Sequence, residues 1–207
     1  MGCAKPHATH WKDLRARPAE QVLAQPGVVA STVGGGYEMT FLVDRYRVDP
    51  EAERIDGLGP ASAEILSDAF QILLLNYLCA PHGGPLDGEL ISEKELPGGA
   101  TFFRGPHALP VQTVVERYGA DVAGFDARAR ALGGVPAPHG DSAMRFRPFT
   151  FLPVTYILWQ ADDEFGASMS ALFDRSITRW FALDSIFIMA GEVSRRLVDP
   201  LWASGRP

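Results

Sequence analysis

Residues 142–160, SAMRFRPFTFLPVTYILWQ, constrain the fold more than any other stretch of the chain. Apolar and polar residues alternate at its start, and the stretch becomes largely apolar towards Trp159. Alternation is typical of a strand with one buried face, whereas a continuous apolar run is typical of a strand buried on both faces. This stretch therefore predicts a strand that passes from the edge of a sheet into its centre.

Further elements are predicted by the spacing of apolar residues. Alternation over residues 34–48, with a return through Ile55, predicts a β-hairpin. Helical spacing occurs in residues 10–27, 59–78, 109–119, 121–134 and 167–197. We expect Ser62 to cap the buried helix of residues 59–78, and the last stretch to form two helices divided near Leu183 and Asp184. The pattern predicts an α+β fold in which a mostly antiparallel sheet packs against helices.

A length of 207 residues suits one substantial core. We expect a single compact α+β domain over residues 11–199, a flexible N-terminus over residues 1–10 and a C-terminal tail over residues 200–207. Residues 80–107 are rich in glycine and proline, and we interpret them as a functional loop region rather than a linker.

Charge and composition exclude several classes of partner. The net charge of −6 argues against a protein that binds the nucleic-acid backbone. The longest apolar run, residues 72–78, falls far short of the ~20 residues needed to cross a bilayer. The two cysteines, Cys3 and Cys79, provide no disulfide framework. We therefore expect a cytoplasmic protein with no nucleic-acid or membrane partner.

Three consecutive acids, Asp162, Asp163 and Glu164, follow the long predicted strand. Capping the next helix needs only one carboxylate, so the other two indicate a site. Carboxylates that pack together in low dielectric cannot all ionise cheaply, and either one pKa rises or a cation binds. The alternative is a solvated junction in which the acids interact with a helix dipole.

Asp174 lies in FDRS, beside apolar residues of the next predicted helix. If it is partly buried, it needs Arg175, Arg179, a hydroxyl or a metal ion as a partner. If it is exposed, it is an ordinary surface residue.

The histidines form a second pattern, because His82, His107 and His139 all stand beside proline or glycine in predicted loops. Loop histidines on a rigid scaffold can converge as metal ligands or acid–base groups, and Asp141 could orient the ring of His139. The alternative is exposed imidazoles in turns. Cys3, His7 and His10 also have metal-compatible spacing, but no fourth ligand is near them.

Standard catalytic motifs are absent from the sequence. Residues 34–36, GGG, lack the lysine of a phosphate-binding loop and precede a predicted strand instead of a helix. The sequence contains no G-x-S-x-G, H-E-x-x-H or C-x-x-C pattern. These absences remove support for the common hydrolase, zinc-protease and thioredoxin classes.

Six ordered segments carry a family resemblance: residues 77–103, 105–110, 125–134, 140–149, 151–165 and 171–176. The most specific points are the D-E-F and L-F-D-x-S segments and the L-P-G-G turn. Together they make the chain, from about Trp11 to Leu197, resemble an uncharacterised prokaryotic family catalogued as domain of unknown function 3786. Some members of this family carry an additional iron–sulfur-type cysteine segment, which implies anaerobic or corrinoid-linked metabolism. This chain lacks that segment.

These observations lead to one favoured hypothesis and two alternatives. The favoured one is a protein that binds a small ligand, cofactor or metal, as an accessory protein of anaerobic or corrinoid-linked metabolism. Its pocket would combine charge, imidazole nitrogens and aromatic walls, supplied by Asp141, Asp162, Asp163, Glu164, Asp174, His82, His107, His139, Trp159, Phe165 and Phe173. Carboxylates alone favour Mg²⁺ or Mn²⁺, added imidazoles favour Fe²⁺ or Zn²⁺, and a single histidine could hold a tetrapyrrole.

The first alternative is a metal-dependent or acid–base enzyme that uses Asp162, Asp163 and Glu164. The second is a subunit that binds a tetrapyrrole or docks a redox or corrinoid protein through its acidic surface.

Overall fold

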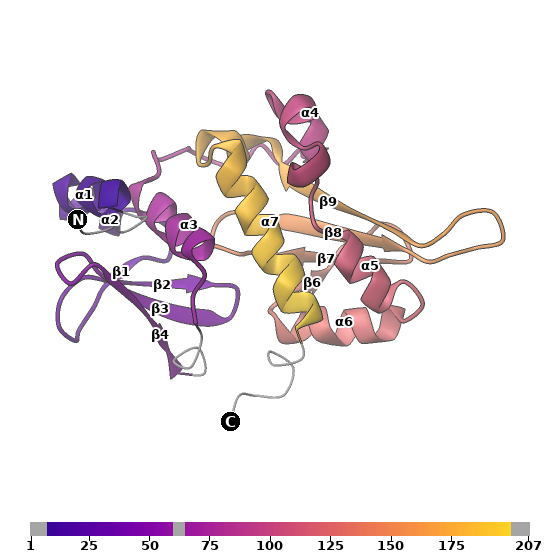
Figure 1. Cartoon of the computed structure of the whole chain (residues 1–207), viewed down its shortest axis with the longest axis horizontal. Coiled ribbons are helices and arrows are strands. Elements are labelled where there is room, and N and C mark those ends of the chain that lie inside the picture. The colour runs from indigo at the N-terminus through magenta and orange to yellow at the C-terminus, as the bar shows by residue number, and fades with distance from the viewer. Residues whose placement is uncertain (1–7, 60–64, 200–207) are drawn as a thin grey trace, which may run out of the picture.

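The computed structural model describes residues 8–59 and 65–199 (Figure 1). Its first sheet has the strand order β1-β2-β3-β4, and its second sheet has the order β5-β9-β8-β7-β6. All neighbouring strands are antiparallel. The strands are β1 (Val29–Ala30), β2 (Tyr37–Phe41), β3 (Asp44–Asp49), β4 (Arg54–Leu58), β5 (Leu90–Ser92), β6 (Val135–Pro136), β7 (Ser142–Phe146), β8 (Val154–Trp159) and β9 (Ser168–Asp174).

Helices accompany both sheets, and the predicted α+β class with antiparallel sheets is confirmed. The α-helices in the described part are α1 (Ala8–Ala16), α2 (Ala19–Leu23), α3 (Asp68–Cys79), α4 (Gly99–Phe102), α5 (Gln112–Tyr118), α6 (Val122–Ala131) and α7 (Leu183–Val198). Short 3-10 turns are η2 (Glu93–Glu95), η3 (Gly105–His107) and η4 (Arg175–Arg179).

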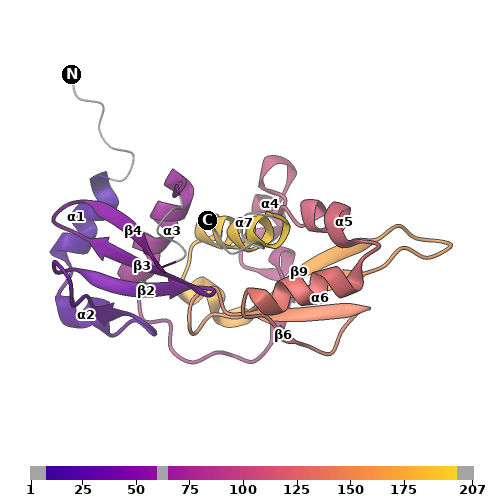
Figure 2. The same ribbon diagram turned by 90° about the horizontal axis from the view of Figure 1, so that it is seen from below.

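The two sheets lie side by side, each with its own helices. Helices α1, α2 and α3 accompany the first sheet, and α5 and α6 accompany the second (Figures 1 and 2). Helix α7 lies between the two groups and packs against α3, α5 and α6. One hydrophobic core runs through both halves, and Tyr77 of α3 stacks on Phe149 with ring centroids 4.1 Å apart. The chain therefore forms a single compact domain, as expected.

Strand β8 occupies the centre of the second sheet, between β7 and β9. Every residue from Val154 to Leu158 is buried, which agrees with the apolar run in the sequence. The hydroxyl group of Tyr156 donates to the carbonyl oxygen of Ala190 at 2.8 Å and so ties this strand to α7. The prediction of one continuous strand over residues 142–160 is wrong, because this stretch forms two strands, β7 and β8, which pair antiparallel to each other.

The prediction of a helix immediately after residue 166 is wrong. Residues 168–174 form strand β9, and α7 alone fulfils the prediction of a C-terminal helix. Met169, Ala171 and Phe173 are buried on one side of β9. Residues at this spacing fit a strand, and their neighbours also satisfy a helical pattern, so pairing with β8 decides between the two.

The predicted helix boundaries also need correction. Helix α3 begins at Asp68, and the hydroxyl of Ser67 accepts its capping hydrogen bond from the N–H of Phe70 at 3.2 Å. The predicted cap Ser62 lies outside the described residues. Helix α1 already begins at Ala8, inside the stretch expected to be flexible, while residues 1–7 and 200–207 lie outside the described part.

Within residues 8–59 and 65–199, no helix is both long enough and apolar enough to cross a bilayer.

Candidate functional site

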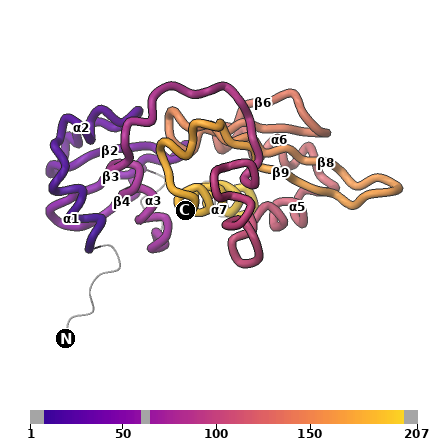
Figure 3. Tube along the Cα trace, turned by 90° about the horizontal axis from the view of Figure 1, so that it is seen from above, coloured from indigo at the N-terminus to yellow at the C-terminus, as the bar shows by residue number. Residues whose placement is uncertain are grey.

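The three consecutive acids lie at the tip of the hairpin that joins β8 to β9, which projects from the body of the molecule (Figures 1 and 3). Asp162, Asp163 and Glu164 are all exposed. The carboxylate of Asp162 accepts hydrogen bonds from the N–H groups of Glu164 at 2.9 Å and Phe165 at 2.6 Å. Both bonds lower the pKa of Asp162, and the bond from the N–H of Phe165 has the larger effect. The three acids therefore do not pack together in low dielectric as predicted, because the strand continues into a hairpin and not into a helix.

The three aromatic residues proposed as pocket walls lie in different environments. Phe165 is 70% exposed at the hairpin tip, and Trp159 is 38% exposed at its base. Phe173 is fully buried in the core, on the inner side of β9. These residues do not enclose one pocket.

Asp174 is buried at the end of β9, with only 2% of its surface exposed. Its carboxylate accepts hydrogen bonds from the backbone N–H groups of Asp87 at 3.0 Å, Gly88 at 2.8 Å and Ser176 at 3.0 Å. Burial alone would raise the pKa of Asp174, but the hydrogen bonds from Ser176, Asp87 and Gly88 outweigh it and lower the pKa. Asp174 is thus a structural anchor for residues 87–88.

The arginines expected to pair with Asp174 bind other acids instead. Arg175 forms a two-bond ion pair with Glu89, at 2.5 and 2.7 Å. Arg179 contacts the carboxylate of Asp87 at 2.9 Å. Both pairs are exposed and contribute little to stability.

The three loop histidines do not form a common site. His82 contacts the ring of Trp180 edge-on at 5.4 Å, whereas His107 stacks on Phe102 at 4.8 Å. His139 lies in the exposed connection between β6 and β7. Each side chain therefore has its own surroundings on a different element.

A shallow hollow adjoins His139, and Asp141 is also in its wall. The carboxylate of Asp141 accepts a hydrogen bond from the N–H of Gln160 at 2.7 Å, and this bond holds the end of β8. Asp141 therefore caps the strand, and no hydrogen bond joins it to the ring of His139 within the described residues.

Metal binding by the predicted residues has no geometric support. Across the part of the chain that the structure describes, no three His, Cys, Asp or Glu side chains come close enough together to hold one ion. Cys3 and His7, which had metal-compatible spacing with His10, lie outside the described residues.

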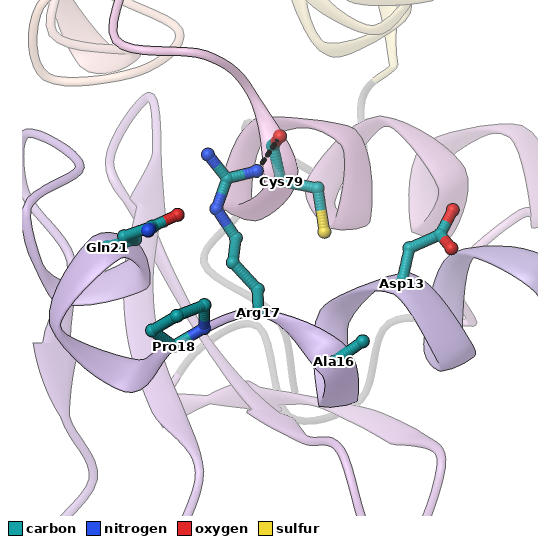
Figure 4. A pocket seen from close by; sticks show the side chains of 6 residues that line it. All are labelled: Asp13, Ala16, Arg17, Pro18, Gln21 and Cys79. Carbon is teal, nitrogen blue, oxygen red and sulfur yellow. Dashed lines mark hydrogen bonds between the residues drawn. The ribbon is translucent and has the colours of Figure 1, made fainter.

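Two hollows share Cys79. The first lies among α1, α2 and the end of α3, and the second lies where the first half of the molecule meets the second. The first, which we call the Arg17 hollow, has a volume of about 460 Å³. It is lined by Asp13, Ala16, Arg17, Pro18, Gln21 and Cys79. Figure 4 shows the sulfur of Cys79 pointing into this hollow from the end of α3, between Arg17 and Asp13.

Arg17 and Gln25 hold the last turn of α3. The guanidinium of Arg17 donates to the carbonyl oxygen of Cys79 (Figure 4). It also donates to the carbonyl oxygen of Ala80 at 2.9 Å, and the side-chain amide of Gln25 donates to the same oxygen at 2.6 Å. The last carbonyls of a helix lack partners within the helix and carry its negative dipole end. Arg17 therefore satisfies these carbonyls and is committed to them.

The thiol of Cys79 is held in its neutral form. Burial raises the pKa of Cys79, the charge of Arg17 opposes the rise, and the charge of Asp13 adds to it. Since the thiolate is the reactive form of cysteine, Cys79 is a weak nucleophile at neutral pH.

The second hollow, which we call the Trp180 hollow, has a volume of about 350 Å³ on the other side of Cys79. Its polar lining comes from His10 of α1, Asn76 and Cys79 of α3, Trp180, and Asp184 and Ser185 of α7. The amide of Asn76 donates to the hydroxyl of Ser185 at 2.9 Å, so α3 and α7 are joined at the wall of the hollow.

Polar atoms around the two hollows lack partners. Nδ1 of His10, Nε of Arg17 and Nε1 of Trp180 are buried and make no hydrogen bond within the described part of the chain. An unpaired buried polar atom is costly and uncommon in native structures, so each one needs an explanation, of which a bound ligand or water is one. This concentration of unpaired nitrogens makes the pair of hollows the candidate site.

Sequence reasoning missed this site, although one signal was present. His10 and Asp13 are spaced i and i+3, which places them on one face of α1, and Arg17 follows directly after the helix ends at Ala16. That face adjoins the end of α3, and no local pattern reveals this contact.

A second polar group that sequence reasoning missed is buried between the two halves. Arg196 of α7 has no exposed surface and lies between the rings of Phe41 and Phe70, at 4.7 and 4.5 Å. Its guanidinium also contacts the carboxylate of Glu192 and the hydroxyl of Tyr46. This group is enclosed by the core and has a structural role.

Comparison with known proteins places the chain in a family. The model of the family described as "Domain of unknown function (DUF3786)" matches residues 20–196. No curated protein and no solved structure matches the chain. Since the match covers most of the chain, from α2 to the last turns of α7, the protein belongs to the family of domain of unknown function 3786.

Proposed function

We propose that the protein binds a small ligand or cofactor in the Trp180 hollow. The main support for this proposal is that Trp180, whose indole N–H lacks an acceptor, lines a hollow built by three separate parts of the chain. Binding sites for small molecules are typically concave, with apolar walls and a few polar groups that orient the ligand. Trp180, Phe181 and Pro81 supply the apolar part, and His10 and Ser185 supply the polar part.

The chemistry of the hollow favours an organic ligand. Asp184 is the only carboxylate among its lining residues, whereas Mg²⁺ and Mn²⁺ prefer several oxygen ligands. The neutral thiol of Cys79 is a poor ligand for soft metals, which bind the thiolate. His10 is the lining residue that could provide an imidazole to a tetrapyrrole or to Fe²⁺ or Zn²⁺.

An acid–base enzyme built on Asp162, Asp163 and Glu164 has less support, because these exposed carboxylates adjoin neither hollow. General acids and bases work best in enclosed sites that shift their pKa towards neutral pH, and the pKa of Asp162 is instead lowered.

Docking of a protein partner is a second candidate role, and the projecting hairpin favours it (Figure 1). Phe165 exposes 70% of its surface beside Asp163 and Glu164. Interfaces commonly place an aromatic residue at the centre and charges at the rim. A redox or corrinoid protein with a basic rim around an apolar pocket would fit, and the protein would then serve as a cytoplasmic accessory subunit of anaerobic metabolism.

The binding proposal is tested by native mass spectrometry of protein purified without chelator, together with metal analysis and the visible absorption spectrum. We expect a bound organic molecule in the wild type. An Ala182→Trp variant, which places an indole at the exposed rim of the Trp180 hollow, should lose that molecule. The matched Ala161→Trp variant in the hairpin should retain it.

The proposal fails if the wild type carries no bound molecule, or if the Ala182→Trp variant retains it. If metal analysis finds a stoichiometric metal and native mass spectrometry finds no organic molecule, the ligand is a metal ion and the proposal of an organic ligand is rejected. A Soret-like band would identify a tetrapyrrole.

A further inference from the structure

Residues 80–89, which we call the strap, connect α3 to β5 without helix or strand. The strap begins in the wall of the Trp180 hollow, where Ala80 and Pro81 line it. It then crosses from the first half of the molecule to the second (Figure 3). One connection thus joins the candidate ligand site to the end of β9.

The near end of the strap covers the indole nitrogen of Trp180. Only 3% of the surface of Trp180 is exposed, and its Nε1 has no hydrogen-bond partner in the described part. The backbone at Gly83 approaches so closely that an added Cβ would lie 2.4 Å from Nε1, and the ring of His82 meets Trp180 edge-on. Because position 83 is glycine, the strap can lie directly against the indole ring of Trp180, and the indole N–H beneath the strap is left without an acceptor.

The far end of the strap is fastened by polar contacts. The buried carboxylate of Asp174 accepts hydrogen bonds from the backbone N–H groups of Asp87 and Gly88. Arg179 adds bonds to the carbonyl oxygen of Pro85 at 2.5 Å and to the carboxylate of Asp87. The far end of the strap is therefore held by Asp174, with smaller contributions from the exposed arginines Arg179 and Arg175, the second of which binds Glu89.

The closed strap is a balance between opposing terms. Its polar fastening favours closure, whereas the unpaired indole N–H beneath it opposes closure. A ligand that offers an acceptor to this N–H would interact with the open state only, and it would shift the population towards that state.

We propose that the strap is the lid of the Trp180 hollow, and that its opening presents the indole N–H of Trp180 to a hydrogen-bond acceptor of the ligand. This inference rests on the proposed function for the identity of the site. Because an indole N–H only donates, the ligand must carry an acceptor at this point, such as a carbonyl oxygen or an unprotonated ring nitrogen.

Hydrogen exchange read by mass spectrometry tests the lid without any ligand. The Asp174→Asn variant keeps the shape of the side chain but replaces one accepting oxygen by an NH₂ group that faces N–H donors. We expect amide exchange in residues 82–89 to accelerate about tenfold or more, because losing a charge-assisted bond to a buried carboxylate is worth at least one such factor. Exchange in α6 should stay unchanged.

A second variant keeps the test decisive if Asp174→Asn perturbs the whole fold. Arg179→Gln removes the two arginine bonds to the strap from a half-exposed position, and it should accelerate exchange in residues 82–89 by a smaller factor. The matched control is Asp163→Asn in the distant hairpin, which should leave the strap unchanged.

The indole N–H provides a direct readout of the cover. In a ¹⁵N-labelled protein, the Trp180 indole signal is assigned by its loss in Trp180→Phe, and its exchange with solvent should be slow in the wild type. In Asp174→Asn and Arg179→Gln, exchange of this proton should accelerate together with that of the strap amides.

The lid proposal is refuted if amide exchange in the strap is unchanged in both variants. It is also refuted if strap exchange accelerates while the indole N–H of Trp180 exchanges as slowly as in the wild type. Either result leaves the binding proposal standing, since that proposal depends on the molecule found in native mass spectrometry. Conversely, strap exchange could accelerate in the variants while native mass spectrometry finds no bound molecule in the wild type. In that case the strap is a mobile cover, but the proposed ligand site is rejected.

Discussion

The guanidinium of Arg196 donates a hydrogen bond to the hydroxyl of Tyr46 at 3.0 Å, although the two residues are 150 positions apart. This contact joins α7 to β3, one of the two inner strands of the first sheet. Both side chains are fully buried. The two halves of the molecule are thus connected by a charged group as well as by apolar packing.

Replacing Arg196 by methionine should therefore destabilise the protein strongly. Glu192 and Asp44 are buried beside Arg196 and would lose its positive charge. Breaking a buried ion pair by removing one partner costs ~3–5 kcal/mol. Urea unfolding measures the change. The exposed Arg145→Met variant serves as the control and should shift stability by less than ~0.5 kcal/mol. Equal effects of the two substitutions would contradict the structural role of Arg196.

Asp174 should make stability depend on pH in the acid range. Its pKa is lower in the folded state than the unfolded value of about 3.9, so its stabilising contribution is complete above that value. The contribution is lost as the pH falls through the folded pKa. Thermal unfolding between about pH 6 and about pH 2 should show a smaller decrease in Tm for Asp174→Asn than for the wild type. Parallel curves for the two proteins would refute the anchoring role.

Cys79 should react slowly with iodoacetamide at neutral pH, because burial raises the pKa of its thiol. The neighbouring charges act in opposite directions. In a Cys3→Ser background, Asp13→Asn should accelerate alkylation of Cys79, since Asp13 raises the pKa, and Arg17→Gln should slow it, since Arg17 lowers the pKa. Peptide mass spectrometry measures both rates. A change in the same direction for both variants would show that access, and not charge, controls the thiol.

The acids at the hairpin tip should be dispensable for the fold and for the Trp180 hollow. Because Asp163 and Glu164 are exposed, the double substitution Asp163→Asn and Glu164→Gln should change the free energy of unfolding by less than ~0.5 kcal/mol. Native mass spectrometry should find the same bound molecule as in the wild type. Loss of the bound molecule from this double variant would show that the acidic residues are part of the binding site.

The same hairpin variants separate the binding role from docking of a partner. Phe165→Ser should weaken capture of a redox or corrinoid protein without changing the thermal stability of the isolated chain, because Phe165 is mostly exposed. Size-exclusion chromatography of the mixed proteins measures the complex. Unchanged co-elution would remove the hairpin from the interface.

Local sequence patterns predicted much of the fold. The apolar run at residues 154–158 identified the central strand β8, and the helical spacing in residues 109–134 identified α5 and α6, which are followed by glycines. These elements could be recognised because each forms within a short window, where the spacing of buried side chains matches a single period. The family resemblance was likewise visible in the order of its segments, and the family match confirmed it.

Tertiary structure alone decided the orientation of the acids and the place of the hollows. Asp162 turns outward because β8 pairs with β9 across a hairpin, and Met169 to Phe173 fit that strand as well as they fit a helix. The candidate site joins His10, Cys79 and Trp180, which come from distant parts of the chain. Side-chain periodicity determines which face of an element is buried, but the partner that covers that face is set by packing of the whole chain.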